Sequence, residues 1–302
     1  MEGERGKGGP RPDWRPLEGR RVVSLAVNVP GPVAAARLAA LGARVVKVEP
    51  PGGDPLARFA PAWYRSLVAG QEVLELDLKE SAGRALLEER LDGADLLLTA
   101  QRPSALARLG LGRERLEERF PRLRHLALVG HPAPDEEAPG HDLTYLAEAG
   151  LLAPPELPRT LAADLLGAER LVSAALALLL APPGEDPRHA EVALAEAAAA
   201  LAEPLRHGLT APGGVLGGGY PFYRLYPARS GWVALAALEP RFAERLRREL
   251  GLDRGDAAEL EAAFRQRDAA EWEAWARSRD LPLAAVRRVV AAGPPAAGEP
   301  PR

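Results

Sequence analysis

The sequence predicts an α/β fold in two domains, a large one built on a doubly wound parallel sheet and a smaller α+β domain. Three observations predict it. Short apolar runs alternate with longer helical segments through the first half of the chain. A stretch rich in Gly and Pro at residues 212–219 then interrupts the pattern. Beyond it, a hairpin pattern is followed by helical segments.

The first half of the chain reads as repeated strand and helix. A strand is predicted at 21–26 and a helix at 32–41, which ends at Gly42, a residue type suited to the left-handed conformation after a helix. A strand at 45–49 completes a βαβ unit, whose strands are parallel and whose crossover is right-handed. The repeat continues with strands at 73–78, 95–99 and 125–129 and helices at 81–90 and 113–120. These elements predict a Rossmann-like sheet, with a ligand site beyond the carboxyl ends of its strands.

The second half contains a helical core and a separate small domain. Residues 165–180 are apolar on nearly every face, which is typical of a helix buried all round or in a subunit interface. An Ala-rich helix is expected at 191–201. The small domain is expected to contain strands at 222–225 and 232–236 and helices at 241–250, 257–266 and 269–279. The predicted organisation is a disordered arm at 1–15, a large domain at 16–190, a linker helix at 191–215, a small domain at 216–280 and a C-terminal return segment at 281–302.

Composition excludes several classes of function. The 302 residues include 39 basic and 42 acidic ones, a net charge of −3, which gives no reason to expect nucleic acid or a membrane as partner. Cysteine is absent, and the five histidines lack metal-ligand spacing, so no metal is expected. The most apolar run, 171–181, is shorter than the ~20 residues of a membrane span. With no signal-peptide core near Met1, we expect a cytoplasmic protein.

A histidine and a carboxylate form a candidate proton-transfer pair. His141 lies in the run GHDLTY at 140–145, and Asp164 stands just before the long apolar helix. The dipole of that helix would favour the carboxylate form of Asp164. Simpler interpretations are a partly buried structural histidine and an aspartate that is only the N-cap of the helix, a role compatible with catalysis. Asp142 is interpreted as the N-cap of a short helix that ends at Gly150. A nicotinamide cofactor is disfavoured: Glu49 ends the second strand, as such cofactors require, but residues 27–32 supply a single glycine.

Several stretches form one larger pattern: LEGRRV at 17–22, GP at 31–32, LGARVVKVEPPGGDP at 41–55, LDLK at 76–79, ADLL at 94–97, RP at 102–103 and LGL at 109–111. Over roughly residues 17–290, the chain resembles CoA-transferase family III, the CaiB/BaiF family, which includes α-methylacyl-CoA racemases. The run at 140–145 and the GGG at 217–219 resemble the racemase branch more than the formyl-CoA transferase branch.

The resemblance implies roles for particular residues. His141 and Asp164 match the catalytic pair, and Glu239 matches an acid that orients the histidine; alone, Glu239 reads equally as a surface acid at a helix start. The implied CoA-binding positions are Arg102, Arg108, Gly140, Asp142, Tyr145, Gly217, Gly218 and Gly219. Guanidinium groups suit phosphates, although solvated surface arginines are the alternative. The three glycines also suit a flexible joint between domains.

The implied reaction is racemisation of a 2-methylacyl-CoA. A base on one face of a planar enolate and an acid on the other invert the α-carbon, while backbone amides near Asp164 and the glycine loop hold the oxyanion. Coenzyme A is then part of the acyl-CoA thioester substrate, with no bound cofactor, and the family's interlocked homodimer is implied. Two alternatives stay open: a CoA-transferase that uses Asp164 as nucleophile, through an acyl-aspartyl anhydride, and a non-catalytic paralogue.

Some positions depart from the family pattern. Ala69, Gln71 and Glu72 stand where the family has a basic turn. Ser104 replaces a glycine, Gln101 replaces an aromatic residue, and the loop after Val129 reads GHP at 130–132. These departures remove positive charge from the expected CoA-phosphate site and leave the proton-transfer pair in place.

Overall fold

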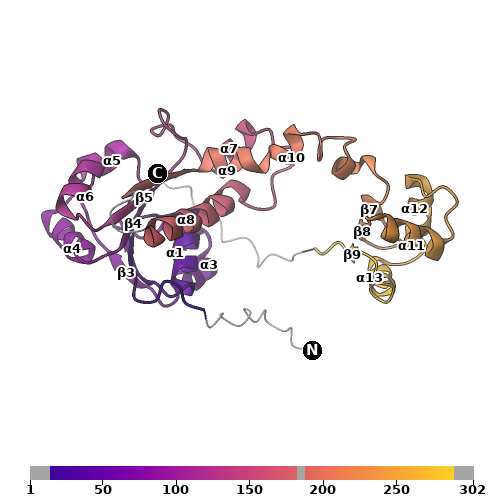
Figure 1. Cartoon of the computed structure of the whole chain (residues 1–302), viewed down its shortest axis with the longest axis horizontal. Helices are drawn as coiled ribbons and strands as arrows, with labels where there is room; N and C mark the ends of the chain where they lie inside the picture. The colour runs from indigo at the N-terminus through magenta and orange to yellow at the C-terminus, as the bar shows by residue number, and fades with distance from the viewer. Residues whose placement is uncertain (1–13, 182–187, 289–302) are drawn as a thin grey trace. The chain divides into compact units, whose positions relative to one another are not determined.

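The computed structural model describes residues 14–181 and 188–288, which belong to two compact units that meet in sequence between Leu201 and Ala202 (Figure 1). The arm predicted at 1–15 lies outside the described residues except for Trp14 and Arg15. The predicted α/β class is confirmed: the first unit holds a six-stranded parallel sheet, and the second holds a three-stranded antiparallel sheet.

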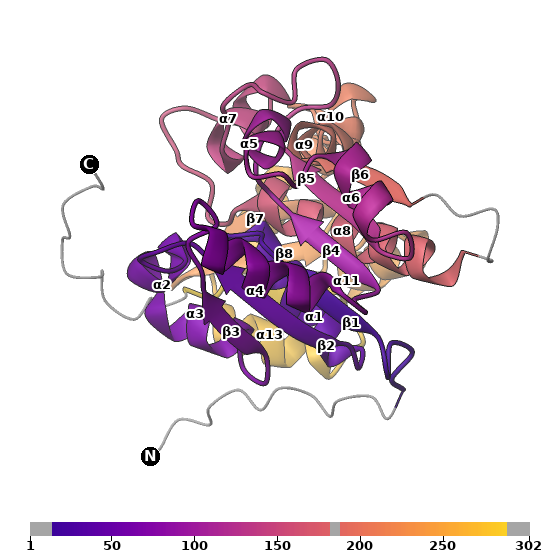
Figure 2. The same cartoon turned by 90° about the vertical axis from the view of Figure 1, so that its left-hand side faces the viewer.

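The parallel sheet has the strand order β3-β2-β1-β4-β5-β6 (Figure 2). The strands are β1 (Arg21–Ser24), β2 (Arg44–Glu49), β3 (Glu72–Glu75), β4 (Leu96–Thr99), β5 (Arg124–Val129) and β6 (His189–Ala193). The chain builds outward from β1 to β3 and then returns to β4 on the other side of β1. The order therefore reverses between β1 and β4, and ligands of such sheets bind at the carboxyl edge of this switch point.

Strand β6 is a correction to the sequence-based prediction. Residues 191–193 were expected to begin a helix, but they pair with β5 in parallel, and helix α9 (Leu194–Leu201) starts directly after them. The segment is rich in alanine, whose strong helix propensity hides a strand. Its pairing with β5 decides the conformation, because Val192 and Ala193 are buried there.

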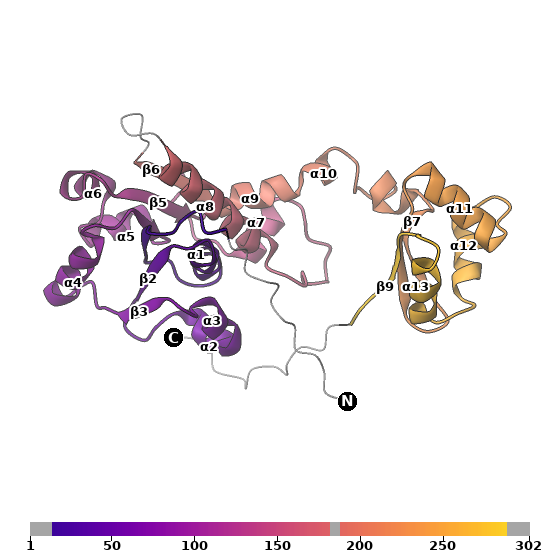
Figure 3. The ribbon, with the colours of Figure 1, turned by 60° about the horizontal axis from the view of Figure 1, so that its bottom comes forward.

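Helices cover both faces of the sheet (Figure 3). On one face lie α1 (Pro30–Ala40) and α8 (Ala162–Leu180), which share a hydrophobic core with Leu96 and Leu98. On the other face, α4 (Ser81–Leu91), α5 (Pro103–Arg108) and α6 (Arg113–Arg119) share a core with Leu97. Neighbouring residues of β4 thus pack into the cores on opposite faces of the sheet, as the alternation of side chains along a strand requires.

Helix α8 is not buried on every face in this chain. Leu171 and Ala175 are fully buried, whereas Glu169, Ser173 and Leu180 are exposed along one stripe. Three short helices that were not predicted, α2 (Pro55–Phe59), α3 (Pro61–Leu67) and α5, each begin with proline. Proline suits the first helical turn but reads as a loop signal in a sequence.

The second unit is an α+β domain with the antiparallel strand order β7-β8-β9. The predicted hairpin is confirmed as β7 (Tyr223–Pro227) and β8 (Trp232–Ala236). Strand β9 (Leu283–Ala285) was not predicted and falls in the expected return segment. The helices are α10 (Glu203–Arg206), α11 (Pro240–Leu250), α12 (Ala257–Phe264) and α13 (Ala269–Arg277). Among residues 14–181 and 188–288, no helix combines the length and the apolar composition that crossing a membrane requires.

Candidate active site

A cavity of about 290 Å³ lies at the carboxyl edge of the sheet, at the switch point. Its walls come from the loops after β1, β4 and β5 and from the starts of α7 (Asp142–Glu148) and α8. His141 and Asp164 both line it. His141 directly precedes α7, and Asp164 lies in the first turn of α8. The fold therefore brings the two candidate catalytic residues from different elements to one site.

Asp164 occupies the first turn of α8 and is partly buried. Its pKa is raised to about 7, first because burial removes solvent from the carboxylate and second because the carboxylate of Asp142 is near. This corrects two expectations. Asp164 is not the N-cap, a position held by Leu161. The helix dipole does not keep the group ionised at low pH, because desolvation and a like charge outweigh the dipole.

Asp142 has a different role from the one predicted. The N-cap of α7 is His141, and the hydroxyl of Thr144 accepts from the His141 N–H at 3.0 Å and donates to its carbonyl oxygen at 2.8 Å. Asp142, only 4% exposed, instead accepts a hydrogen bond from the N–H of Asp164 at 3.0 Å. The carboxylate therefore joins the starts of α7 and α8. His141 itself is exposed rather than partly buried.

Tyr145 forms one wall of the cavity and is 2% exposed. Two glycines leave room for its ring. A Cβ on Gly140 would lie 2.4 Å from Tyr145 Cε1, and one on Gly130 would lie 2.6 Å from its hydroxyl oxygen. Burial, and then the carboxylate of Asp164, raise the pKa of Tyr145, so the phenol is a neutral hydrogen-bond donor at physiological pH.

The two candidate phosphate-binding arginines lie at opposite ends of α5. Arg102 directly precedes the helix, is exposed and lines the cavity. Arg108 is in the last turn and lines a separate hollow together with Arg84 and Arg115. Only Arg102 therefore belongs to the cavity that contains the proton-transfer pair.

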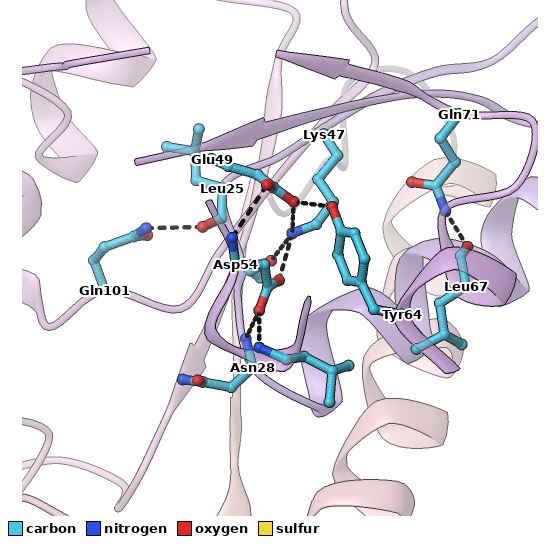
Figure 4. A network of polar contacts seen from close by, with 11 residues as sticks. Leu25, Asn28, Lys47, Glu49, Asp54, Tyr64, Leu67, Gln71 and Gln101 are labelled. Atoms are coloured by element: carbon cyan, nitrogen blue, oxygen red, sulfur yellow. Dashed lines mark hydrogen bonds and ion pairs between the residues drawn. The ribbon is translucent and has the colours of Figure 1, made fainter. Parts of the chain in front are cut away.

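A second cavity, of about 550 Å³, lies on the other side of the switch point along the ends of β1, β2 and β3. It shares Val27 and Gln101 with the first cavity. The side chain of Gln101 donates to the carbonyl oxygen of Leu25 at 2.8 Å (Figure 4). The lining is mostly apolar, with Lys79 as its cation. Sequence reasoning did not predict this cavity, although the LDLK run at 76–79 contributes part of its wall.

A buried polar network supports this edge of the sheet (Figure 4). Lys47 is fully buried, and its Nζ forms ion pairs with Asp54 at 2.8 Å and Glu49 at 3.3 Å. Asp54 also accepts from the N–H of Asn28 at 3.0 Å, which ties the loop after β1 to the loop after β2. Glu49 accepts from the hydroxyl of Tyr64 as well. The acid that a dinucleotide cofactor would need for its ribose is thus already bound by the protein.

The remaining candidates belong to the second unit. Glu239 is exposed and precedes α11, where its carbonyl oxygen accepts from the N–H of Phe242 at 2.9 Å. This matches the simpler interpretation of a surface acid at a helix start. In the glycine run, Gly218 has φ of +91°, and a Cβ on Gly217 would lie 1.8 Å from the carbonyl oxygen of Ala211. The tight backbone turn that this run forms therefore requires glycine at these positions.

In the parts of the chain that the structure describes, no group of three His, Asp or Glu side chains is placed to hold a metal ion. The polar groups of the first cavity include an acid of raised pKa, an exposed imidazole, a neutral phenol and a guanidinium, together with the side chains of Asn28, Gln101 and Glu136. Such a set can move a proton next to a carbonyl group and hold an anionic ligand.

Comparisons with known proteins place the chain in a family. The family model of CoA-transferase family III matches residues 17–293. Human α-methylacyl-CoA racemase is 33% identical over 255 residues, which cover 78% of this chain and 65% of the racemase. Cinnamoyl-CoA:phenyllactate CoA-transferase from Clostridium sporogenes is 36% identical over 149 residues, covering 45% and 36%. The matched region thus spans less than two thirds of either relative.

Solved structures show the same fold. A hypothetical protein from Mycobacterium tuberculosis superposes with a TM-score of 0.79 and 26% identity, covering 91% of this chain and 86% of that one. A CaiB/BaiF family protein from Brucella suis superposes with a TM-score of 0.74 and 21% identity over 90% and 84%. With the family model matching nearly all the described residues, the chain belongs to CoA-transferase family III.

Proposed function

We propose that this protein racemises a 2-methylacyl-CoA thioester, with Asp164 and His141 as the acid and base on opposite faces of the α-carbon. The observation that carries the proposal is that both side chains line one cavity in which Asp164 has a pKa of about 7. Near neutral pH such a carboxylate is populated in both protonation states and is a stronger base than an ordinary one. The racemase among the relatives supports the same reaction.

In the proposed mechanism, ionised Asp164 removes the α-proton and the electron pair of the C–H bond moves into an enolate. Protonated His141 then donates a proton to the opposite face, which inverts the centre. In the reverse direction the two residues exchange roles. One expected donor to the enolate oxygen is not available, because the N–H of Asp164 is bound to Asp142. We assign that role to the phenol of Tyr145, which lines the cavity.

We place the two ends of the substrate in the two cavities. The acyl thioester occupies the first cavity, beside His141 and Asp164. The nucleotide of CoA crosses the switch point past Val27 and Gln101 into the second cavity, whose apolar walls suit a purine ring. Arg102 and Lys79, one at each cavity, provide cations for the phosphates. This path does not use the turn that contains Gln71 and Glu72, where the family's basic residues are missing.

A second candidate function is CoA transfer, which the transferase relative favours. Asp164 Oδ would attack the thioester carbonyl and expel the CoA thiolate, which leaves a mixed anhydride. The CoA thiolate would then attack the aspartyl carbonyl of that anhydride and release the first acid, which leaves an aspartyl-CoA thioester. The carboxylate of a second acid would displace the CoA thiolate from this thioester to form a new anhydride. The thiolate would finally attack the acyl carbon of the second acid, which gives the new acyl-CoA and frees the Asp164 carboxylate. His141 has no required role in this scheme. The interlocked homodimer, the contribution of Glu239 and a cytoplasmic location also remain proposals, drawn from the resemblance and the composition.

Stereochemistry separates the candidates. Each enantiomer of a 2-methylacyl-CoA is incubated with the protein in D2O, and both α-deuteration and inversion are followed by NMR and chiral analysis. The racemase is supported if Asp164→Asn and His141→Ala both abolish inversion. Because each residue serves one face of the α-carbon, any deuteration that remains should occur with one enantiomer in Asp164→Asn and with the other enantiomer in His141→Ala. Glu118→Gln, on an exposed residue of α6, is the control and should match the wild type.

Other outcomes contradict the racemase. CoA transfer to a second carboxylic acid without α-deuteration, lost in Asp164→Asn but not in His141→Ala, would establish the transferase. No reaction of either kind, together with no heat of CoA binding in calorimetry, would leave the non-catalytic paralogue.

A further inference from the structure

The loop between β5 and α7, residues 130–141, is part of the cavity wall. Gly130, Glu136 and Gly140 of this loop line the cavity, and His141 ends it. The loop therefore leads directly into the backbone of His141, which the hydroxyl of Thr144 in α7 also holds. What holds the loop in place bears directly on the geometry of the proton-transfer pair.

Glu137 attaches the middle of this loop to α5. Its Oε1 accepts from the backbone N–H of Ser104 at 2.7 Å, and its Oε2 accepts from the Ser104 hydroxyl at 2.9 Å. Both carboxylate oxygens thus bind one residue, and we call this pair of hydrogen bonds the Ser104–Glu137 clasp. Nearer its start, the loop is also tied to α7, because His131 Nε2 lies 3.0 Å from Glu148 Oε2.

The charges around the clasp keep it closed at neutral pH. The hydrogen bonds from Ser104 lower the pKa of Glu137, and the nearby guanidinium groups of Arg102 and Arg108 lower it further. The carboxylate is therefore ionised, and both hydrogen bonds are charge-assisted. Glycine, the residue that the family pattern has at position 104, could supply the backbone N–H but not the hydroxyl.

We propose that Ser104 and Glu137 are positioning residues, whose clasp holds the 130–141 loop against α5 so that His141 stays at the cavity opposite Asp164. This role rests on the proposed function for its catalytic consequence. The contribution of the clasp to holding the loop is independent of the proposed function, because it follows from the two Ser104–Glu137 hydrogen bonds. The competing explanation is that Glu137 does not hold the loop and only interacts electrostatically with Arg102 and Arg108. It would then compete with CoA phosphates for these two guanidinium groups.

Three variants test the clasp on the full chain. Glu137→Gln removes the charge, Ser104→Gly removes the hydroxyl, and Ser104→Thr keeps the hydroxyl. Glu118→Gln, on an exposed residue of α6, is the control with the same change of charge. Hydrogen exchange by mass spectrometry measures the loop peptide, and the deuterium assay measures kcat and KM.

We expect faster exchange across 130–141 in Glu137→Gln and Ser104→Gly, with Ser104→Thr and the control like the wild type. We also expect kcat to fall about tenfold in the first two variants while KM changes less than about twofold, because small misplacements of a catalytic group cost rate more than binding. Rescue by Ser104→Thr would separate the hydroxyl bond from a general effect of substitution.

Each of the other possible results would overturn a specific part of the proposal. Unchanged loop exchange in both clasp variants would overturn the clasp, whatever the activity. Faster loop exchange with unchanged kcat would overturn the positioning role. A lower KM with unchanged kcat in Glu137→Gln would show competition with CoA for the arginines instead. If the wild-type protein is inactive but loop exchange is still faster in the clasp variants, the proposed function and the catalytic role of the clasp are both overturned. The conclusion that the clasp holds the loop would then still stand.

Discussion

The backbone N–H of Asp164 donates a 3.0 Å hydrogen bond to Oδ1 of Asp142, so two carboxylates meet where α7 and α8 begin. Asp142 is nearly inaccessible to water, and its charge adds to the burial that raises the pKa of Asp164 to about 7. A group in the first turn of a helix would ordinarily be a weak base. Here its surroundings reverse that tendency and suit it to proton transfer near neutrality.

The charge of Asp142 can be removed while its hydrogen bond is kept. In Asp142→Asn, Oδ1 still accepts from Asp164, but the like charge is gone, so the pKa of Asp164 should fall. Because the proposed mechanism needs ionised Asp164 as base, the acidic limb of kcat/KM against pH should move to lower pH. The shift should be modest, since burial is the larger cause. An unmoved acidic limb would mean that Asp142 contributes structure and no electrostatics.

The raised pKa of Asp164 also predicts a pH-dependent stability. The folded-state pKa of about 7 exceeds the reference value of 3.8, so the folded protein binds this proton more tightly than the unfolded chain. Stability from this group is therefore highest at low pH and is lost as pH rises from about 4 to 7. Asp164→Asn should raise the free energy of unfolding at pH 8 by on the order of 2 to 4 kcal/mol, with little gain at pH 4.

Urea unfolding of both proteins at the two pH values measures this effect. An equal difference at pH 4 and pH 8 would contradict the prediction, because a change in packing alone does not depend on the titration of Asp164.

The buried charges under the sheet edge predict a large loss of stability in Lys47→Met. Removing the lysine leaves Glu49 and Asp54 buried beside each other without their cation. Breaking a buried ion pair from one side costs about 3 to 5 kcal/mol, because an uncompensated charge remains. Lys79→Met, on an exposed lysine, should change the free energy of unfolding by less than about 0.5 kcal/mol. A loss below about 1 kcal/mol in Lys47→Met would show that water replaces the ammonium group.

The close approach of Gly140 to Tyr145 predicts that Gly140→Ala damages the site. The new Cβ would lie 2.4 Å from the buried ring, which must move into the cavity or displace the loop. Overpacking of this kind costs about 1 to 3 kcal/mol of stability, and the activity should fall with it. Gly112→Ala is the matched control, because its nearest neighbour would be 3.7 Å away. Thermal unfolding and the deuterium assay on both variants check the prediction, and equal behaviour of the two would contradict it.

Much of the fold follows from local patterns in the sequence. Strands β1, β2, β4 and β5 contain apolar runs, and predicted helices lie between β1 and β2, between β3 and β4 and between β4 and β5, so the strands and their parallel arrangement could be predicted. Strand β3 was also predicted, at 73–78, although it lies at Glu72–Glu75 and the helices before it were not predicted. Strands β6 and β9 could not, because alanine-rich residues have no strand signal until a neighbouring strand pairs with them. The family pattern, too, is a property of the linear sequence.

The sequence alone determined the α/β class, the order of most elements and the family, since these depend on periodicity, on turn residues and on motifs of consecutive residues. Tertiary structure decided that Asp142 faces Asp164, that Glu137 binds Ser104, and that Lys47 is enclosed by Glu49 and Asp54. Burial and the neighbours across the fold set the pKa of a group and the partner of a buried charge, and residues distant in the sequence supply many of these neighbours.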